Sequence, residues 1–356
     1  MQSASMQQRA PISLYQAEDM LHYIDSHDRE VWVQVGKALA AEFGDAAGDV
    51  FMRWSEGAAN FKESSARTTW RSCVRKPGGY SMGTIVKLAL EGNYRFERSE
   101  PPDQAELDRL RIEREARRKR EAEERARAQL SAEQVALEHW RDADRHGRSE
   151  YVQRKGIEAP ESCRFTPGGW LVVPMLRYDL PREQALKGVQ HIRPDGQKRF
   201  TAGMAKLGAA CRLGLAEVGA PVLLCEGWAT GMSLRMAVDR RLPVYVAFDA
   251  GNLGEVAWIV SQLHPRSPLV LCADDDYQTY DKGGRPMNPG RVAAAEARDE
   301  IQEAGGVAVL TYPIFSALGR PPGSTDFNDL HLAEGLEVVR SQIELAVALA
   351  RDLKHG

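Results

Sequence analysis

Four short apolar runs in the second half of the chain, each followed by a stretch with helical spacing, constrain the fold most. The runs are PVLLC, PVYVAF, PLVLCA and VAVLTY, which begin at Pro221, Pro243, Pro268 and Val307. Uninterrupted apolar strands that alternate with helices are typical of a parallel sheet covered on both faces. The pattern therefore predicts an α/β fold with a doubly wound parallel sheet, whose ligands lie at the carboxyl ends of the strands.

Acidic residues follow these runs at the predicted strand ends. Glu226 closes the first run, Asp274 and Asp276 close the third, and Asp326 and Asp329 lie in STDFNDL after the last. Alternate residues of an extended segment point the same way, so Asp274 and Asp276 can share one ion. Carboxylates suit Mg²⁺ or Mn²⁺, and we expect these five to form a divalent-metal site. For any one acid taken alone, the alternative is a hydrated carboxylate that caps a helix.

The rest of the chain divides into three further regions that differ in composition and hydrophobic pattern. Residues 12–97 have helical spacing, with Val31, Val35, Leu39 and Phe43 on one stripe, and predict a small helical domain. We expect its three tryptophans to pack its core rather than to stack on bases. Residues 149–215 contain GGWLVVPMLRYD and ALKGVQHIRPDGQKRFTAG, which predict strands and a hairpin at the Asp-Gly pair.

Residues 98–148 contain a Pro-Pro pair at Pro101 and Pro102 and are then dense in Glu, Arg and Ala. Opposite charges three or four residues apart support an exposed single helix without a buried face. Apolar residues do not hold the repeating positions of a coiled coil in the most charged part. We expect a solvated helical linker, and tracking along DNA by its arginines is the alternative.

Charge and cysteine spacing exclude several classes of protein. The formal net charge of -3 disfavours a general DNA-coating protein, so contacts with polyanions must come from local basic patches. No apolar run approaches the roughly 20 residues that cross a bilayer, and we expect a cytoplasmic protein without membrane contact. The five cysteines make no C-x-x-C pair, so no zinc is expected.

The segments LLCEGWATGMSL, VAFDAGNL, LCADDD, NPGRVAAAEA and STDFNDL together resemble the TOPRIM domain of primases from plasmids, phages and integrative elements. The resemblance covers residues 221–332 and implies a TOPRIM domain over about 216–350. It implies that Glu226 is a general acid/base or a metal ligand. It also implies that Asp274 and Asp276 bind Mg²⁺.

Two neighbouring regions extend the resemblance. Residues 149–215 resemble the segment that precedes TOPRIM in DnaG-type primase cores, where basic residues line a groove for template and nucleotide phosphates. By that likeness we expect phosphate contacts from Lys155, Lys198, Arg199 and Lys206. The first region, with WVQVGKAL, FMRWS, TTWRSC and GYSMGTIVKLA, resembles the small PriCT-type module that accompanies primases.

The resemblance implies a nucleotidyltransferase, namely a DNA primase that makes short RNA primers from nucleoside triphosphates on single-stranded DNA during mobile-element replication. No G-x-x-x-x-G-K-[ST] loop is present, so any replicative helicase is expected to be a separate partner. The alternatives are a TOPRIM nuclease and a non-catalytic nucleic-acid-binding adaptor; a topoisomerase is disfavoured by the lack of further large domains. The insertion YQTYDKGGRPMNPG delays the glycine expected after Asp276, which puts the shape of the site in question.

Overall fold

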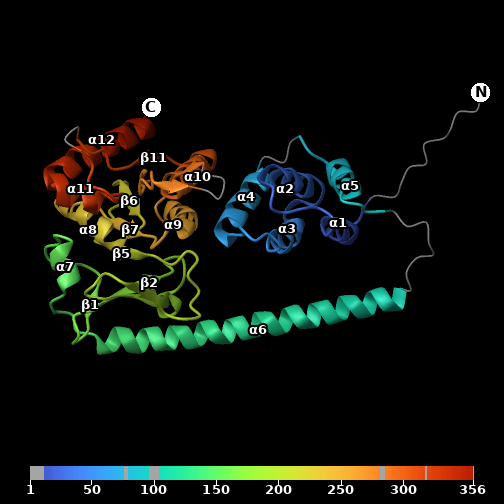
Figure 1. The fold of residues 1–356 in the computed structure, drawn as a ribbon, viewed down its shortest axis with the longest axis horizontal. Helices are drawn as coiled ribbons and strands as arrows, with labels where there is room; N and C mark the ends of the chain where they lie inside the picture. Colours follow the sequence, from blue (N-terminus) through green and yellow to red (C-terminus); the bar gives the residue numbers. More distant parts are fainter. Residues whose placement is uncertain (1–11, 76–78, 96–103, 281–284, 317–318, 356) are drawn as a thin grey trace, which may run out of the picture. The chain divides into compact units, whose positions relative to one another are not determined.

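Figure 1 shows the computed structural model of the protein, which describes residues 12–75, 79–95, 104–280, 285–316 and 319–355. The chain forms two compact units, Met1–Gln104 and Ala105–Gly356. The boundary that we expected between residues 97 and 98 falls outside the described residues. In the described ranges, no helix combines the length and apolar character needed to span a bilayer.

The amino-terminal unit is helical, as the spacing predicts. Its first two helices begin at side-chain caps, because Ser13 forms a capping box with Gln16 and Asp28 accepts hydrogen bonds from the first turn that follows it. A short 3₁₀ helix, Gly44–Ala47, joins the second and third helices. The α-helices are α1 (Leu14–Leu21), α2 (Arg29–Phe43), α3 (Gly48–Ser55), α4 (Glu63–Arg75) and α5 (Met82–Glu91).

Aromatic packing centred on Phe51 forms the core of this unit. The Phe51 ring stacks on Trp32 and on Trp70, with ring centroids 5.4 Å apart in both pairs. Trp54 donates its indole N–H to the carbonyl oxygen of Ile24 at 3.0 Å. The structure thus confirms that the three tryptophans have a packing role in this domain.

The second unit contains a small antiparallel sheet. Its strands follow the order β1-β2-β3-β4, which leaves β4 at one edge. Arg193 and Gln197 close the predicted hairpin between β3 and β4, and Gly196 supplies the positive φ of 93° that the turn requires. The elements of this region are α7 (Glu150–Arg154), β1 (Arg164–Phe165), β2 (Leu171–Leu176), a 3₁₀ helix (Arg182–Gln184), β3 (Leu186–Ile192) and β4 (Lys198–Phe200).

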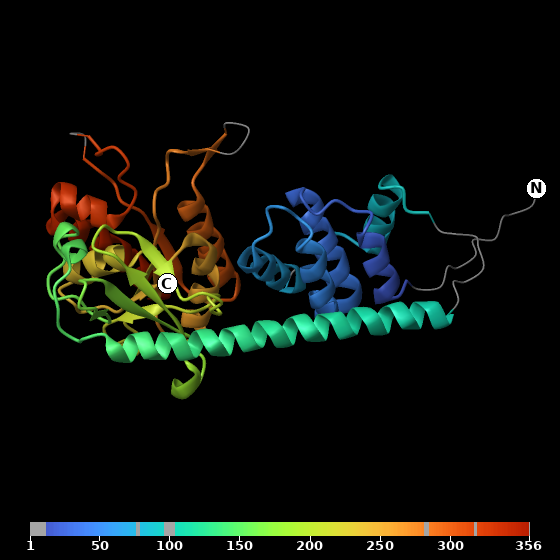
Figure 2. The same ribbon diagram turned by 60° about the horizontal axis from the view of Figure 1, so that its bottom comes forward.

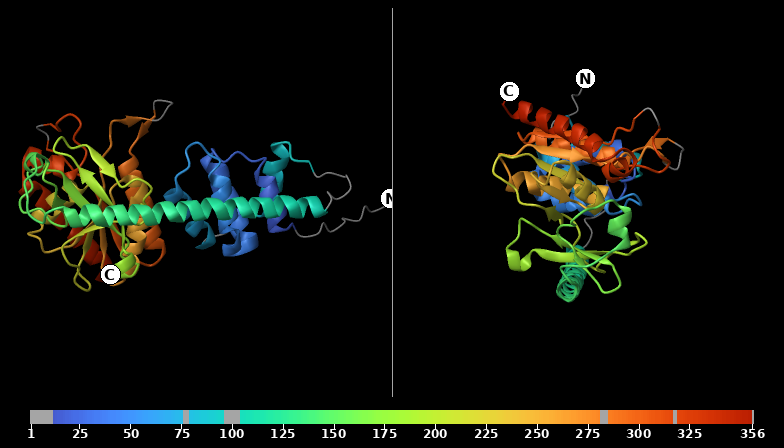
Figure 3. Two further views of the ribbon diagram at one scale, coloured as in Figure 1. Left: turned by 90° about the horizontal axis from the view of Figure 1, so that it is seen from below. Right: turned by 90° about the vertical axis from the view of Figure 1, so that its left-hand side faces the viewer.

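The long helix α6 (Gln104–Asp142) packs its last turns against one face of this small sheet. Figures 2 and 3 show this end of the green helix running along the sheet. Ala136, with Ala143 just beyond the helix, is buried against Val172 and Val189, and Lys187 of β3 binds Glu133 at 2.6 Å. The helix is present as predicted, but the expectation of a fully solvated spacer is wrong for these turns, because small alanines create a buried face there.

The main sheet has the strand order β11-β8-β6-β7-β5. Its first four strands are parallel, and they are the four apolar runs of the sequence: β6 (Val222–Cys225), β7 (Val244–Val246), β8 (Leu269–Cys272) and β11 (Ala308–Thr311). The predicted parallel sheet is therefore confirmed. A short antiparallel strand that we did not predict, β5 (Cys211–Leu213), pairs with β7 at the edge.

Helices cover both faces of this sheet, as a doubly wound fold requires (Figure 1). One face packs against α9 (Ala250–Leu263) and α10 (Pro289–Glu303). The other face packs against α8 (Trp228–Ala237), α11 (Phe327–Glu334) and α12 (Leu336–His355). The small sheet adds the face with Leu171, Val173 and Met175 to this second core, so the two sheets share one hydrophobic interior.

Gly231 in α8 shows how closely the helices approach the sheet. A Cβ atom there would lie 2.8 Å from Val246 Cγ2 and 3.1 Å from Leu213 Cδ1. We expect Gly231→Ala to lower the free energy of unfolding by about 1–3 kcal/mol, since overpacking outweighs the gain in helix propensity. The matched variant Gly251→Ala in α9 meets only Asp249 at 3.3 Å and should be neutral or stabilising. Urea titration of both variants checks this, and equal stabilities would contradict it.

Candidate active site

Parallel register brings the predicted acids to one end of the main sheet. Cys225 of β6 pairs with Cys272 of β8, so Glu226 and Asp274 leave neighbouring strands almost side by side. Asp326 caps the start of α11 and accepts a hydrogen bond from the hydroxyl of Thr230 in α8 at 2.9 Å. The acidic side chains from three separate sequence segments therefore gather at the carboxyl ends of the strands.

Burial dominates the electrostatics of this acidic cluster. It raises the pKa of Glu226 to about 7, and repulsion by Asp276 adds to the effect. Burial also raises the pKa of Asp274 well above its ordinary value, and Glu226 and Asp326 reinforce that rise. The pKa of Asp326 is raised by burial and by Asp329. A cation bound among these carboxylates would stabilise their charged forms, and would thereby offset both the effect of burial and the mutual repulsion.

Two oxygens of the cluster have no hydrogen-bond partner among the described residues, although both are buried. They are Oε1 of Glu226 and Oδ1 of Asp274. Buried carboxylate oxygens of this kind suit a hard divalent cation, so the donor types fit Mg²⁺ or Mn²⁺. In the part of the chain that the structure describes, no three His, Cys, Asp or Glu side chains are already arranged around a common point as metal ligands.

Asp326 and Asp329 have clear structural roles at the start of α11. Asp326 accepts a hydrogen bond from the Asp329 backbone N–H at 2.8 Å, and Asp329 Oδ2 accepts from the Asp326 N–H at 3.3 Å. The Asp329 carboxylate also accepts from the Thr325 N–H at 2.8 Å and lies 3.7 Å from Lys155 Nζ. This capping box fixes the position of Asp326, and it makes Asp329 a support of the cluster.

The insertion after Asp276 ends close to the acidic cluster, where α10 begins. Its described residues form the hairpin strands β9 (Thr279–Tyr280) and β10 (Pro286–Met287), and α10 begins directly afterwards. The Gly290 N–H donates to Asp276 Oδ2 at 3.1 Å. A Cβ atom at Gly290 would lie 2.5 Å from the Asp274 carbonyl oxygen and 3.0 Å from Glu226 Oε1. The delayed glycine therefore still allows α10 to approach the acids closely.

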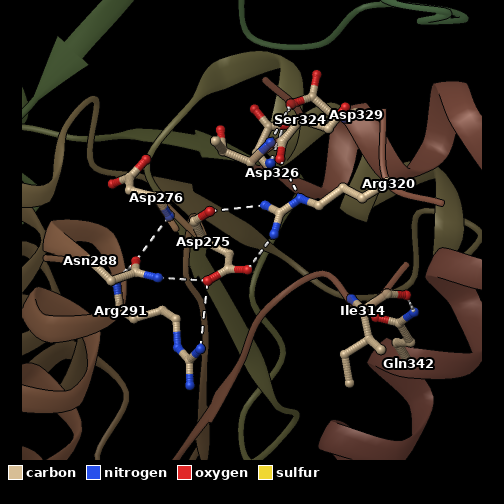
Figure 4. A network of polar contacts seen from close by, with 11 residues as sticks. Asp275, Asp276, Asn288, Arg291, Ile314, Arg320, Ser324, Asp326, Asp329 and Gln342 are labelled. Carbon is tan, nitrogen blue, oxygen red and sulfur yellow. Dashed lines mark hydrogen bonds and ion pairs between the residues drawn. The ribbon is translucent and has the colours of Figure 1, made fainter. Parts of the chain in front are cut away.

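Asp275 lies in a separate network of polar contacts, shown in Figure 4. Its carboxylate accepts hydrogen bonds from Arg320 Nη1 and Asn288 Nδ2, both at 2.6 Å. Arg320 also donates to the Asp275 carbonyl oxygen at 2.9 Å and stacks 3.8 Å from the centroid of Tyr277. Burial alone would raise the pKa of Asp275, but the hydrogen bonds from Arg320 and Asn288 hold it below its ordinary value.

This network fixes the loop that carries Asp274 and Asp276. Asn288 Oδ1 accepts the Asp276 N–H at 2.9 Å, and Arg320 donates to the carbonyl oxygen of Ser324, two residues before Asp326. Our sequence interpretation found neither Asn288 nor Arg320. The only sequence signal for such partners was the alternation along the strand end, which turns Asp275 away from Asp274 and Asp276.

The four basic residues predicted to bind phosphate do not form one surface. Lys198 lies close enough to Glu226 and Asp274 to lower the pKa of both acids. Arg199 follows it on β4 and points to the opposite face, where it lines a cavity beside α6. Lys206 pairs with Asp249 and lies 4.1 Å from the ring centroid of Phe200, and Lys155 pairs with Asp329. Lys198 is thus the basic residue of this set that faces the acids without a described ion pair.

The raised pKa of Glu226 makes stability depend on pH in the metal-free protein. A carboxyl group with a raised pKa in the folded state binds its proton more tightly there, so stability falls as pH rises from about 4.5 to about 7. We expect the Tm in chelator to drop by roughly 5 °C between pH 5 and pH 7.5. Calorimetry checks this. Glu226→Gln should show a smaller drop than the exposed control Glu344→Gln, and equal drops would argue against the shift.

The Arg320 network makes a second testable contribution to stability. Arg320→Ala leaves the buried Asp275 carboxylate without its main partner, and we expect a loss of about 3 kcal/mol in the free energy of unfolding. Arg298→Ala breaks an ion pair with Asp299 whose side chains are 34% and 58% exposed, and should cost less than about 0.5 kcal/mol. Chemical denaturation measures both. Similar losses in the two variants would refute a positioning role for Arg320.

Comparison with known proteins identifies two domains. Residues 17–89 match the model of the family "Primase C terminal 2 (PriCT-2)", and residues 221–337 match that of the Toprim domain. Two proteins of Escherichia coli named DNA primase TraC are similar in sequence: one is 31% identical over 212 residues, and the other is 32% identical over 169 residues. These matches cover 56% and 47% of this chain, but only 19% and 11% of the relatives.

Solved primase structures are more distant. The primase fragment of the bacteriophage T7 primase-helicase protein is 16% identical, with a TM-score of 0.37, over 55% of this chain and 69% of that one. The RNA polymerase domain of Mycobacterium tuberculosis primase DnaG is 19% identical, with a TM-score of 0.31, over 55% of this chain and 62% of that one. From the family matches, the chain contains a PriCT-2 domain and a Toprim domain, and it is similar in sequence to DNA primase TraC of Escherichia coli.

Proposed function

We propose that this chain is a metal-dependent DNA primase, which joins nucleoside triphosphates into short RNA primers on single-stranded DNA. The observation that supports this most is the pair of buried, unpartnered oxygens on Glu226 and Asp274 at neighbouring strand ends of a Toprim domain. The PriCT-2 domain and the similarity to DNA primase TraC favour synthesis over cleavage. The chain spans about a fifth or less of those relatives, so its activity is proposed from its own site.

Glu226, Asp274 and Asp276 are the residues that would hold the metal, with Asp326 beside them. When bound, Mg²⁺ or Mn²⁺ supplies charge that stabilises the attacking and leaving oxygens of an in-line phosphoryl transfer. The protein's own contribution is to bury the carboxylates of Glu226 and Asp274 and to keep them close to those of Asp276 and Asp326. Asp329 fixes Asp326 through the capping box, and Asn288 and Arg320 fix the loop of Asp274 and Asp276.

Glu226 is also suited to move a proton. Burial raises the pKa of its carboxyl group to about 7 in the metal-free protein, so Glu226 holds a proton more readily there than an ordinary glutamate, and we assign it the proton of a primer 3′-hydroxyl. Lys198 lies near enough to influence Glu226 electrostatically, and we assign it a contact with the phosphates of the incoming nucleotide. Arg199 and Lys206 are assigned to contacts with the nucleic acid farther from the acids, and Lys155, which pairs with Asp329, to a contact beside them.

The proposal includes a division of the chain and a set of partners. We propose a PriCT-type module at 12–97, a charged helical linker at 98–148, a basic subdomain at 149–215 and the catalytic Toprim domain at 216–350. The last turns of α6 would hold the basic subdomain in place, because they pack on its sheet. A separate replicative helicase and the replication of a mobile element complete the proposed setting.

Primer synthesis by the purified chain tests the function. With single-stranded template, nucleoside triphosphates and Mg²⁺ or Mn²⁺, we expect short RNA products on a sequencing gel. Glu226→Gln and Asp274→Asn should each reduce synthesis roughly 100-fold or more, since they remove the proton acceptor and a metal-binding charge. The control Asp299→Asn changes an exposed carboxylate and should retain full activity.

The same gels separate the alternatives. Absence of any product with every metal, from chain that remains folded by circular dichroism, would overturn the proposal. Shortening of an end-labelled template, lost in Glu226→Gln, would identify a Toprim nuclease instead. Template binding without synthesis or cleavage, unchanged in Glu226→Gln and Asp274→Asn, would identify a non-catalytic adaptor.

A further inference from the structure

A cavity of about 600 Å³ lies between the end of α6 and the small sheet, on the face away from the acidic cluster. We call it the α6 pocket. Its lining includes His139 and Asp142 of α6, Trp170 and Val172 at the start of β2, His191 of β3 and Arg199 of β4. Its volume falls in the range of roughly 300–1,000 Å³ that is typical of small-molecule sites. Nothing in the proposed catalytic step uses it.

Flat rings form one wall of the α6 pocket. The His139 and His191 rings meet edge to face with centroids 4.9 Å apart, and Trp170 lies 6.4 Å from His191 in the same manner. Arg193 places its guanidinium 5.1 Å from the centroid of Trp170. Burial and the neighbouring His139 lower the pKa of His191, so its ring is neutral at physiological pH. Together these rings give the α6 pocket an aromatic wall, against which another flat ring can pack edge to face or offset-stacked.

Charged groups stand at the edge of this wall. Arg199 is exposed, and because it pairs with His191 across the strands, its side chain lies on the pocket face of the sheet. A guanidinium at the edge of an aromatic surface suits a phosphate attached to a stacked ring. Asp142 offers an acceptor for the amino group of a base. The combination of stacking surface, cation and acceptor matches a nucleotide better than a purely apolar ligand.

The position of β4 connects the α6 pocket with the acidic cluster. Lys198 and Arg199 are consecutive residues of β4, so one faces the acids and the other faces the α6 pocket. The strand lies at the edge of its sheet, with a neighbour on one side only. A nucleic-acid strand that passes Lys198 can therefore continue around this edge and reach Arg199.

We propose that the α6 pocket binds a nucleobase together with its adjoining phosphate, as a second nucleic-acid contact on the opposite face of the small sheet from the acids. The ligand is either a base of the single-stranded template or a free nucleotide. This inference rests on the proposed function only in its choice of nucleic acid as the ligand, because binding at the α6 pocket needs no phosphoryl transfer.

The test measures binding by the full chain in chelator, where no synthesis occurs. Fluorescence anisotropy follows a labelled single-stranded DNA and a matched strand in which every base is absent. We expect Trp170→Leu to weaken binding of the normal strand roughly tenfold and to leave the abasic strand unchanged, because stacking on an aromatic ring contributes per base. Arg199→Ala should weaken both strands, since it contacts phosphate.

Matched variants control for folding and for surface changes. Trp170→Phe keeps a flat ring and should restore most of the binding lost in Trp170→Leu. Tyr15→Leu removes an exposed ring from the amino-terminal unit, and Arg182→Ala removes an exposed cation from a turn before β3; both should bind like the unaltered chain. Thermal unfolding verifies that each variant is folded. If Trp170→Leu does not fold, the loss of binding in Arg199→Ala relative to its control Arg182→Ala still decides the question.

The source of the ligand is resolved by a second titration with a fluorescent ATP analogue. Loss of analogue binding in Trp170→Leu identifies a free nucleotide, and loss of strand binding alone identifies the template; both support the α6 pocket. Strand and analogue affinities equal to those of the unaltered chain, in Trp170→Leu and Arg199→Ala alike, would overturn it. If binding depends on the bases but the chain makes no primer, the proposal for the α6 pocket stands and only the proposed catalytic function fails.

Discussion

The burial of neighbouring carboxylates at the ends of β6 and β8, which also repel one another, is the constraint on which the Toprim domain depends. The register of Cys225 with Cys272 forces Glu226 and Asp274 together, and burial raises the pKa of both. Such a cluster persists only if its surroundings hold it. Thr230 binds Asp326 and the N–H of Gly290 binds Asp276, while other groups fix the loops from outside. This acidic end of the sheet is therefore assembled at a cost in stability, which a bound cation would offset.

Much of this arrangement follows from local sequence. The four apolar runs predict the parallel sheet, and alternation along LCADDD predicts that Asp275 points away from its neighbours. The partners of Asp275 do not follow, because Arg320 lies 45 residues away and meets it only after the sheet has formed. The buried face of α6 was missed for a related reason. Its alanines resemble those of any solvated helix until the small sheet covers them.

The small sheet links the two proposed nucleic-acid contacts. Leu171, Val173 and Met175 join the core of the Toprim domain, whereas Val172 and Val189 face α6. A strand alternates its side chains between faces, so a thin sheet of this kind presents one chemistry to the acids and another to the α6 pocket. Basic residues that are neighbours in the sequence thus serve different surfaces, and a sequence cluster such as Lys198 and Arg199 is not evidence of a single basic groove.

The insertion between Asp276 and α10 is closed at its base. Asn288, at its far end, binds both the carboxylate of Asp275 and the N–H of Asp276 at its near end. The two ends are thereby clamped by one amide side chain, independently of what lies between them. The length and sequence of the hairpin can therefore change while the acids keep their positions. The two residues that must remain are Asn288 and Gly290.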